Sequence, residues 1–148
     1  MNRMIYLSII CVFACLACSG ATENQEFYDA LRSEDSSLLE AKLAQGIDVN
    51  NARLDGWRPL PFSIANGKAV SAVWLLENGT DANSMDGGGN NAIFWAVKVK
   101  DERLITLLLH RGANPCQAGV NGETAISMAT EYADGALLKG LGRCPDEH

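Results

Sequence analysis

The stretch that decides the fold is residues 79–111, which reads GTDANSMDGGGNNAIFWAVKVKDERLITLLLHR. It matches the chain on both sides of itself when the sequence is shifted by 33 residues. Two independent series of glycines keep this spacing, one of Gly46, Gly79 and Gly112 and the other of Gly56, Gly89 and Gly122. A constant period in this range is typical of stacked structural units. The sequence therefore predicts a repeat array.

Each unit combines a polar loop with two short helices. In the central unit we expect a hairpin over 79–91 and helices over 92–99 and 102–110. In the preceding unit, Asp55-Gly56 favours a tight turn within a loop over 46–58, and Pro59 suits the start of a helix. The other predicted helices lie at 26–33, 36–44, 69–78, 125–132 and about 134–141, and the third hairpin spans 112–124.

Several short motifs are shared with a known repeat family. The chain reads GIDVN at 46–50, DG at 55–56, PL at 59–60, ITLLL at 105–109 and GAN at 112–114. This pattern resembles the ankyrin repeat, which opens with Gly-Ala-Asp-Val-Asn, carries Asp-Gly before Thr-Pro-Leu-His and closes with Val-Lys-Leu-Leu-Leu. The resemblance covers residues 26–142 and implies an all-α solenoid of stacked helix-turn-helix units with β-hairpin or loop fingers.

The same resemblance sets the expected subdivision of the chain. A cap repeat is expected at about 26–45, repeats at 46–78, 79–111 and 112–142, and a tail at 143–148. The chain departs from the family at the Thr and His of the Thr-Pro-Leu-His box. The Thr positions hold Arg58, Asn91 and Thr124, and the His positions hold Pro61, Phe94 and Ser127. In the family those side chains form hydrogen bonds within a repeat, so we expect a less stable array.

Residues 1–21 are predicted to be a signal peptide. Arg3 precedes an apolar run over 5–17, which is shorter than the roughly 20 residues of a membrane-spanning helix. Residues 15–18, Cys-Leu-Ala-Cys, resemble the lipobox of bacterial lipoproteins, which implies cleavage before Cys18, its lipidation, and a tether reaching residue 25. The alternative is ordinary cleavage after Ala21. The lipoprotein reading implies a place in the bacterial envelope, in the periplasm and anchored to the outer membrane by the lipid on Cys18 alone.

The cysteines that remain after the signal peptide and Cys18 are Cys116 and Cys144. An even pair in an exported protein predicts a disulfide. The alternative is two free thiols too far apart to pair.

Composition and charge exclude several classes of function. The chain has 12 Lys and Arg against 18 Asp and Glu, a formal net charge of −6, and its cations are scattered, so nucleic acid is not an expected partner. Neither His110 nor His148 belongs to a cluster with zinc-ligand spacing. The run Gly87-Gly88-Gly89 lacks the Lys-Ser/Thr of a phosphate-binding loop. We expect no catalytic residues, no metal and no cofactor.

The resemblance to ankyrin repeats implies a concave binding surface made by the fingers and the exposed ends of the first helices. Matching positions in phase gives the expected partner-binding residues Leu54, Asp55, Trp57, Asn66, Gly88, Asn90, Lys98, Asn121, Glu123 and Tyr132, with Arg32 and Glu131 on further helix ends. Trp57 is either an exposed anchor for a partner or folds back over its own hairpin. Trp74 and Trp95 are expected in the core.

These observations favour a monomeric, exported, non-catalytic ankyrin lipoprotein that binds a protein partner on its finger and concave face. One alternative is an immunity or inhibitor protein that neutralises a toxin or enzyme in the periplasm through an acidic concave face. The other is a soluble periplasmic scaffold that supports envelope or stress enzymes.

Overall fold

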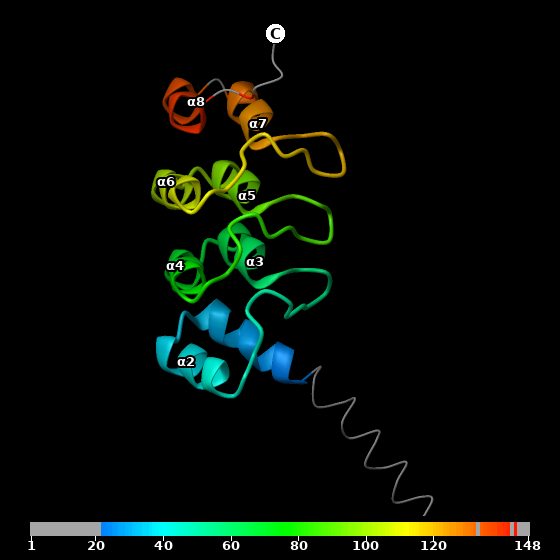
Figure 1. The fold of residues 1–148 in the computed structure, drawn as a ribbon, viewed down its shortest axis with the longest axis vertical. Helices are drawn as coiled ribbons and strands as arrows, with labels where there is room; N and C mark the ends of the chain where they lie inside the picture. The colour runs from blue at the N-terminus through cyan, green and yellow to red at the C-terminus, as the bar shows by residue number, and fades with distance from the viewer. Residues whose placement is uncertain (1–21, 133, 143, 145–148) are drawn as a thin grey trace, which may run out of the picture.

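The computed structural model describes residues 22–132, 134–142 and 144, and these form a stack of helix pairs with loops projecting from one side (Figure 1). One column holds the first helices of the pairs, the helical residues 22–33 and then α3 (Pro59–Ala65), α5 (Ala92–Lys98) and α7 (Ala125–Glu131). The other column holds the second helices, α2 (Ser36–Ala44), α4 (Ala69–Glu77), α6 (Glu102–His110) and α8 (Gly135–Leu141). The predicted all-α repeat fold is confirmed.

The stack is held together by one continuous apolar core between the units. Fully buried side chains recur from unit to unit, so that each helix pair covers the apolar face of its neighbour. Among the largest of them are Phe27, Leu31, Leu60, Ile64, Leu75, Ile93, Val97 and Leu108. A single pair would leave much of this surface in water, and therefore the units depend on stacking for their stability.

Two sequence expectations need correction. The predicted tether over 22–25 is helical and extends the first helix, where Gln25 Nε2 donates a hydrogen bond to Asp29 Oδ1 at 3.1 Å. The predicted hairpins are mostly loops: in the described part of the chain, strand pairing is limited to the isolated bridges Leu54–Trp57 and Met85–Asn91. Turn residues such as the Gly87–Gly89 run occupy too much of each finger to leave room for paired strands.

The glycines that end the second helices have the geometry the period requires. Gly79 has φ +81° and Gly112 has φ +80°, in the left-handed region that L side chains resist by about 1–2 kcal/mol. The chain can thus leave α4 and α6 sharply and enter the next finger.

Among α3, α5 and α7, only α3 lacks a side-chain hydrogen bond at its start. Asn91 accepts a bond from the Phe94 N–H at 3.0 Å, and Thr124 and Ser127 form a reciprocal capping box at the start of α7. Arg58 makes no such cap on α3, and its guanidinium donates instead to the Asn50 carbonyl at 3.1 Å. Asn91 and Ser127 therefore replace the family's threonine and histidine and still form side-chain hydrogen bonds at the helix starts.

Adjacent fingers are joined by asparagine side chains that we call rungs. Asn50 accepts a bond from the Asp81 N–H at 2.8 Å and donates to the Gly79 carbonyl at 3.2 Å. Asn83, in phase with Asn50, accepts from the Asn114 N–H at 2.8 Å and donates to the Gly112 carbonyl at 3.0 Å.

The third position of the rung series is Cys116. It forms a disulfide with Cys144, with a Cα–Cα distance of 5.6 Å. The disulfide therefore ties the last finger to the segment after α8. The two asparagine rungs, by contrast, each tie a finger to the finger that follows it.

Candidate protein-binding face

Five aromatic rings form a continuous row where the fingers meet the first helices, and we call this row the aromatic corner. Tyr28 and Phe62 have centroids 4.8 Å apart, Phe62 and Trp57 6.3 Å, Trp57 and Trp95 5.2 Å, and Trp95 and Phe94 5.7 Å. The row begins in the cap repeat and ends on α5, so it crosses two interfaces between units. Trp57 and Trp95 are both half-buried and pack against the core, so neither residue is fully removed from solvent.

The first finger is fixed to the cap repeat through Tyr28. Its hydroxyl donates a hydrogen bond to the Trp57 carbonyl at 2.5 Å and also lies 3.3 Å from the Ala52 carbonyl. Burial raises the pKa of Tyr28, so the hydroxyl keeps its proton and remains a donor. Leu54 and Trp57 also exchange backbone hydrogen bonds, at 3.2 and 2.9 Å. Trp57 is therefore held in one position before any partner arrives.

The second finger is fixed to α5 through the buried carboxylate of Asp86. It accepts bonds from the Trp95 Nε1–H at 2.9 Å, from the Gly88 N–H at 2.8 Å and from the Asn90 N–H at 2.9 Å. The glycine run is thus ordered by one carboxylate, and the same carboxylate orients the indole of Trp95.

Two cations lie over the aromatic corner. Arg32 Cζ is 5.1 Å from the centroid of Phe62, and Lys98 Nζ is 4.7 Å from that of Trp95. Arg32 also pairs with Asp29 at 2.5 Å. A third cation, Lys100, lies 4.8 Å over the ring of Tyr132. Contacts of this kind hold a positive group above a ring while its hydrogen-bond donors stay in water.

The structure brings together some of the expected partner-binding residues and separates others. Trp57 packs against Phe62 of its own unit and Trp95 of the next, while Leu54 is half-buried beside it. Lys98 lies over the same corner. The exposed residues Asp55 and Asn121 lie on the loops of the first and third fingers.

The remaining expected residues are partly used by the fold itself. Asn66 is exposed and donates to the Phe62 carbonyl at 2.8 Å, and Asn90 Nδ2 lies 3.4 Å from Asp86 Oδ2. Tyr132 is 37% exposed beneath Lys100, and Glu123 is exposed on the third finger. Which of these residues bind a partner stays a prediction.

The sequence analysis did not predict that Phe62 and Trp95 form part of the aromatic corner, or that Asp86 orders the second finger. Trp74 is 7% exposed, as expected for the core, but the expectation of a core position was wrong for Trp95, which is half-buried at the corner. The signal was present in the sequence, because Phe62 and Trp95 are in phase on the first helices. Aromatic residues at that one position in successive units indicate a row across the stack.

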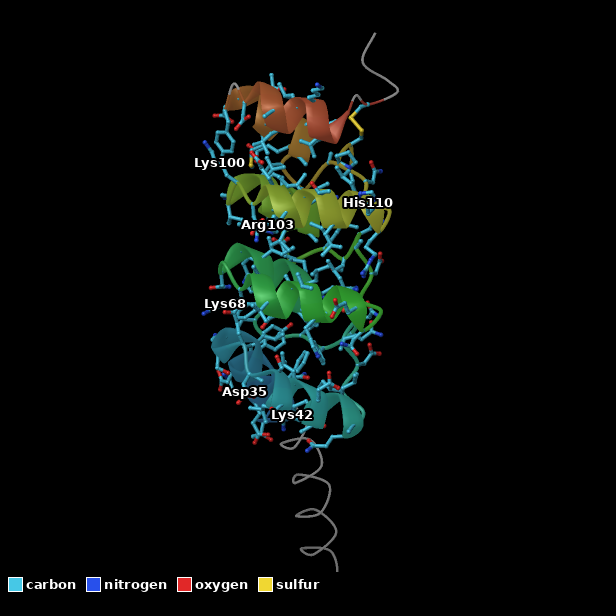
Figure 2. The ribbon with its side chains drawn as sticks, turned by 90° about the vertical axis from the view of Figure 1, so that its left-hand side faces the viewer. Asp35, Lys42, Lys68, Lys100, Arg103 and His110 are labelled. Carbon is cyan, nitrogen blue, oxygen red and sulfur yellow. A yellow bond between two sulfur atoms is a disulfide. The ribbon has the colours of Figure 1, made fainter. Side chains whose placement is uncertain are left out.

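The opposite face of the molecule, formed by the second helices, is shown in Figure 2. A hollow of about 490 Å³ lies there over α4 and α6, lined by apolar residues that include Val70, Val73, Leu104 and Leu107. None of the expected partner-binding residues lines it. Within the part of the chain that the structure describes, no cluster of residues could hold a metal ion, and no helix has the length and apolar character needed to span a membrane.

Stacked helix pairs with projecting loops define a helical repeat protein, a class that binds partners on extended surfaces. A profile described as Ankyrin repeats (3 copies) matches residues 27–118, more than half of the chain. The chain belongs to the ankyrin-repeat family. Ankyrin repeats are generally non-catalytic, so this domain is a protein–protein interaction module.

Individual relatives share the repeat segment. The chain is 31% identical over 118 residues to the E3 ubiquitin-protein ligase hecd-1 of Caenorhabditis elegans, covering 78% of this chain and 4% of that protein. It is 30% identical over 114 residues to an ankyrin repeat-containing protein of Treponema pallidum (strain Nichols), covering 76% of this chain and 38% of that one. The chain thus spans well under half the length of both relatives.

Proposed function

We propose that this chain is an exported lipoprotein that binds a protein partner on the face formed by its fingers and first helices. The observation that carries the binding part is the aromatic corner, where half-buried Trp57 and Trp95 are held rigidly at the surface. Large aromatic side chains in fixed positions are the usual anchors of interfaces, because they bury much area and lose little entropy.

Export and lipidation rest on the sequence and on the cysteine pair. The lipobox-like residues and Cys18 lie outside the described residues. A bridge between Cys116 and Cys144 fits an oxidising compartment such as the periplasm. Residues 22–33 are helical, so lipidation at Cys18 would place the anchor four residues before the first described helical residue and close to the domain.

Site-specific photocrosslinking tests the binding face. A photoreactive residue is placed at Asp55 or Asn121 on the fingers and, as a matched control, at Thr106, which is exposed on α6. In intact cells that express the full chain, we expect a discrete crosslinked species from the finger positions and none from Thr106. Crosslinking of the same protein from Thr106 alone would contradict the proposed face.

Lipidation is tested separately with Cys18→Ser. The wild-type chain, expressed in a Gram-negative bacterium, should incorporate labelled palmitate and fractionate with membranes. The variant should incorporate none. Equal labelling of the two chains, or no labelling of either, would contradict the lipoprotein reading and leave the binding face unaffected.

A further inference from the structure

The cations and the aromatic rings of the binding face are concentrated in the cap repeat and the first two full units. Arg32 of the cap and Lys98 of the second full unit occupy the same position in the repeat, which holds Ala65 in the first full unit and Glu131 in the last. The position of Trp95 becomes Met128 there, and the position of Trp57 becomes Glu123. Both of these glutamates are exposed. The face therefore holds aromatic rings and Lys98 in its first units and glutamates at the same positions in its last unit, although the whole chain carries a net charge of −6.

Apart from Asp55, which is exposed on the first finger, and Asp29, which pairs with Arg32, the acidic side chains near Lys98 are engaged by the fold. Asp101 accepts bonds from the Arg103 and Leu104 N–H groups at 3.1 and 3.0 Å, as the cap of α6. Glu34 accepts from the Val70 N–H at 3.1 Å, and the buried Asp86 accepts from Trp95 and two backbone amides. These carboxylates serve the fold and face backbone donors.

Two lysines, by contrast, make no ion pair within the described residues. Lys98 and Lys100 are both exposed, and the ion pairs of that part of the chain involve Arg32 and Lys42 instead. Lys98 is held over Trp95, so its charge has a defined position next to a half-buried indole. An ammonium group placed beside a half-buried indole complements a carboxylate that is adjacent to an apolar side chain.

We propose that the aromatic corner and Lys98 bind an acidic segment of the partner protein, in which a carboxylate lies beside an apolar side chain. The apolar side chain contacts Trp57 and Trp95, and the carboxylate pairs with Lys98. The acidic end of the face, with Glu123 and Glu131, repels the same segment and fixes its direction along the stack. This inference rests on the proposed function and gives the partner's chemistry.

The probe is a library of random dodecapeptides displayed on phage and selected on the full, oxidised chain. We expect enriched sequences with net negative charge and a Trp, Phe or Leu beside Asp or Glu. Enrichment of neutral or basic sequences would overturn the inference. Affinity of a synthetic representative should fall as salt rises, because the pair with Lys98 is exposed to solvent.

Charge-reversing variants then locate the contact. Lys98→Glu should weaken binding of the synthetic peptide about tenfold, a loss typical of an attractive pair made repulsive. Glu131→Lys should strengthen binding a few-fold. Lys139→Glu, the same charge change at an exposed position on α8, is the matched control and should leave the affinity within about twofold. Equal effects of Lys98→Glu and Lys139→Glu would show only a net-charge effect and overturn the assignment.

A more conservative variant distinguishes a lost contact with the peptide from a loss of folding. Lys98→Met keeps an apolar stem over Trp95 and removes only the charge, so the melting temperature should be unchanged while acidic peptides bind several-fold more weakly. If basic peptides are enriched and still crosslink to the fingers, the inference fails and the proposed function stands. If selected peptides crosslink from Thr106 and never from Asp55 or Asn121, both fail.

Discussion

The interior and the C-terminal end of the stack solve the same problem with different chemistry. Inside the array, Asn50 and Asn83 each join one finger to the next through two hydrogen bonds. At the end, Cys116 occupies the same phase and is joined covalently to Cys144. The asparagine rungs need a following unit that supplies a backbone carbonyl and an N–H group. The disulfide of Cys116 needs only one partner residue, Cys144, and an oxidising environment.

This difference in chemistry agrees with a difference in stability between the terminal helix α8 and the interior helix α6. α8 has seven residues, among them Gly135 and Gly140, and buries only Leu137 and Leu141. α6 has nine residues and lies between two neighbouring helix pairs. Because a terminal unit is covered on one side only, it gains less from stacking. The disulfide compensates for this by restricting the unfolded chain.

Removing the disulfide should produce the largest effect. The bridge closes a segment with a sequence separation of 28 residues, for which chain entropy gives about 3.5 kcal/mol. Cys116→Ser, Cys144→Ser and the double variant should each lower the free energy of unfolding by a similar amount, measured by urea denaturation. If the single variants lost stability and the double variant did not, the loss would come from reactions of the one remaining free thiol and not from the missing disulfide.

Removing an interior rung should cost less. Asn83→Ala deletes two hydrogen bonds between fingers, each worth about 0.5–1.5 kcal/mol net. We expect a loss of about 1–2 kcal/mol and a similar loss for Asn50→Ala. Asn121→Ala, an exposed finger residue, is the matched control and should change stability by less than about 0.5 kcal/mol. If Asn83→Ala matched the control, the rungs would have no role in stability.

Strengthening α8 should reduce its dependence on the bridge. A Cβ at Gly140 would meet nothing within 4 Å, and replacing a helix glycine by alanine stabilises by up to about 1 kcal/mol. Gly140→Ala should therefore raise the melting temperature of the reduced protein by a few degrees and that of the oxidised protein by less. Hydrogen exchange of α8 amides with and without reductant would locate the effect. Equal gains in both states would mean that the bridge and α8 stabilise the protein independently.

The period made most of the fold predictable, because each unit repeats the same apolar spacing and the same helix-ending glycine. The α2 and α6 boundaries agree with the expected ranges, and α4 and α7 end within one residue of them. The extra helical residues at 22–25 escaped notice because polar residues such as Glu23 and Gln25 favour a helix as readily as a linker. Phase arguments succeed for the backbone, which every unit shares.

The binding face was less predictable, because it depends on side chains that differ between units. The aromatic corner combines Tyr28 of the cap, Trp57 of a finger and Trp95 of the next unit. Their proximity follows from the path of the finger, which the hydrogen bond from Tyr28 to the Trp57 carbonyl fixes. No local pattern specifies that contact, since its partners are 29 residues apart.

Lowering the pH should weaken the first asparagine rung and leave the disulfide of the last unit unaffected, and this is the smallest of the expected effects on stability. Asp48 accepts bonds from the Asn51 side chain at 2.8 Å and from the Asn50 and Asn51 N–H groups at 2.8 and 3.0 Å, and these bonds lower the pKa of Asp48. Its carboxylate thus orients the residue that forms the first rung. In the last unit the neutral Asn114 takes that place and accepts from the Cys116 N–H at 3.0 Å.

A carboxyl group whose pKa is lowered by folding stabilises the native state above its unfolded value of about 3.9, and this contribution is lost as the pH falls through the lower folded value. The melting temperature should therefore begin to drop as the pH falls below about 5 and keep dropping through the lowered pKa of Asp48, and Asp48→Asn should show a smaller drop, since its amide does not titrate. Asp55→Asn, the same change at an exposed position of the same finger, serves as the control for net charge. The comparison between interior and terminal connections would fail if Asp48→Asn and Asp55→Asn had the same acid profile, because the carboxylate would then act only through the overall charge and not through the rung it orients.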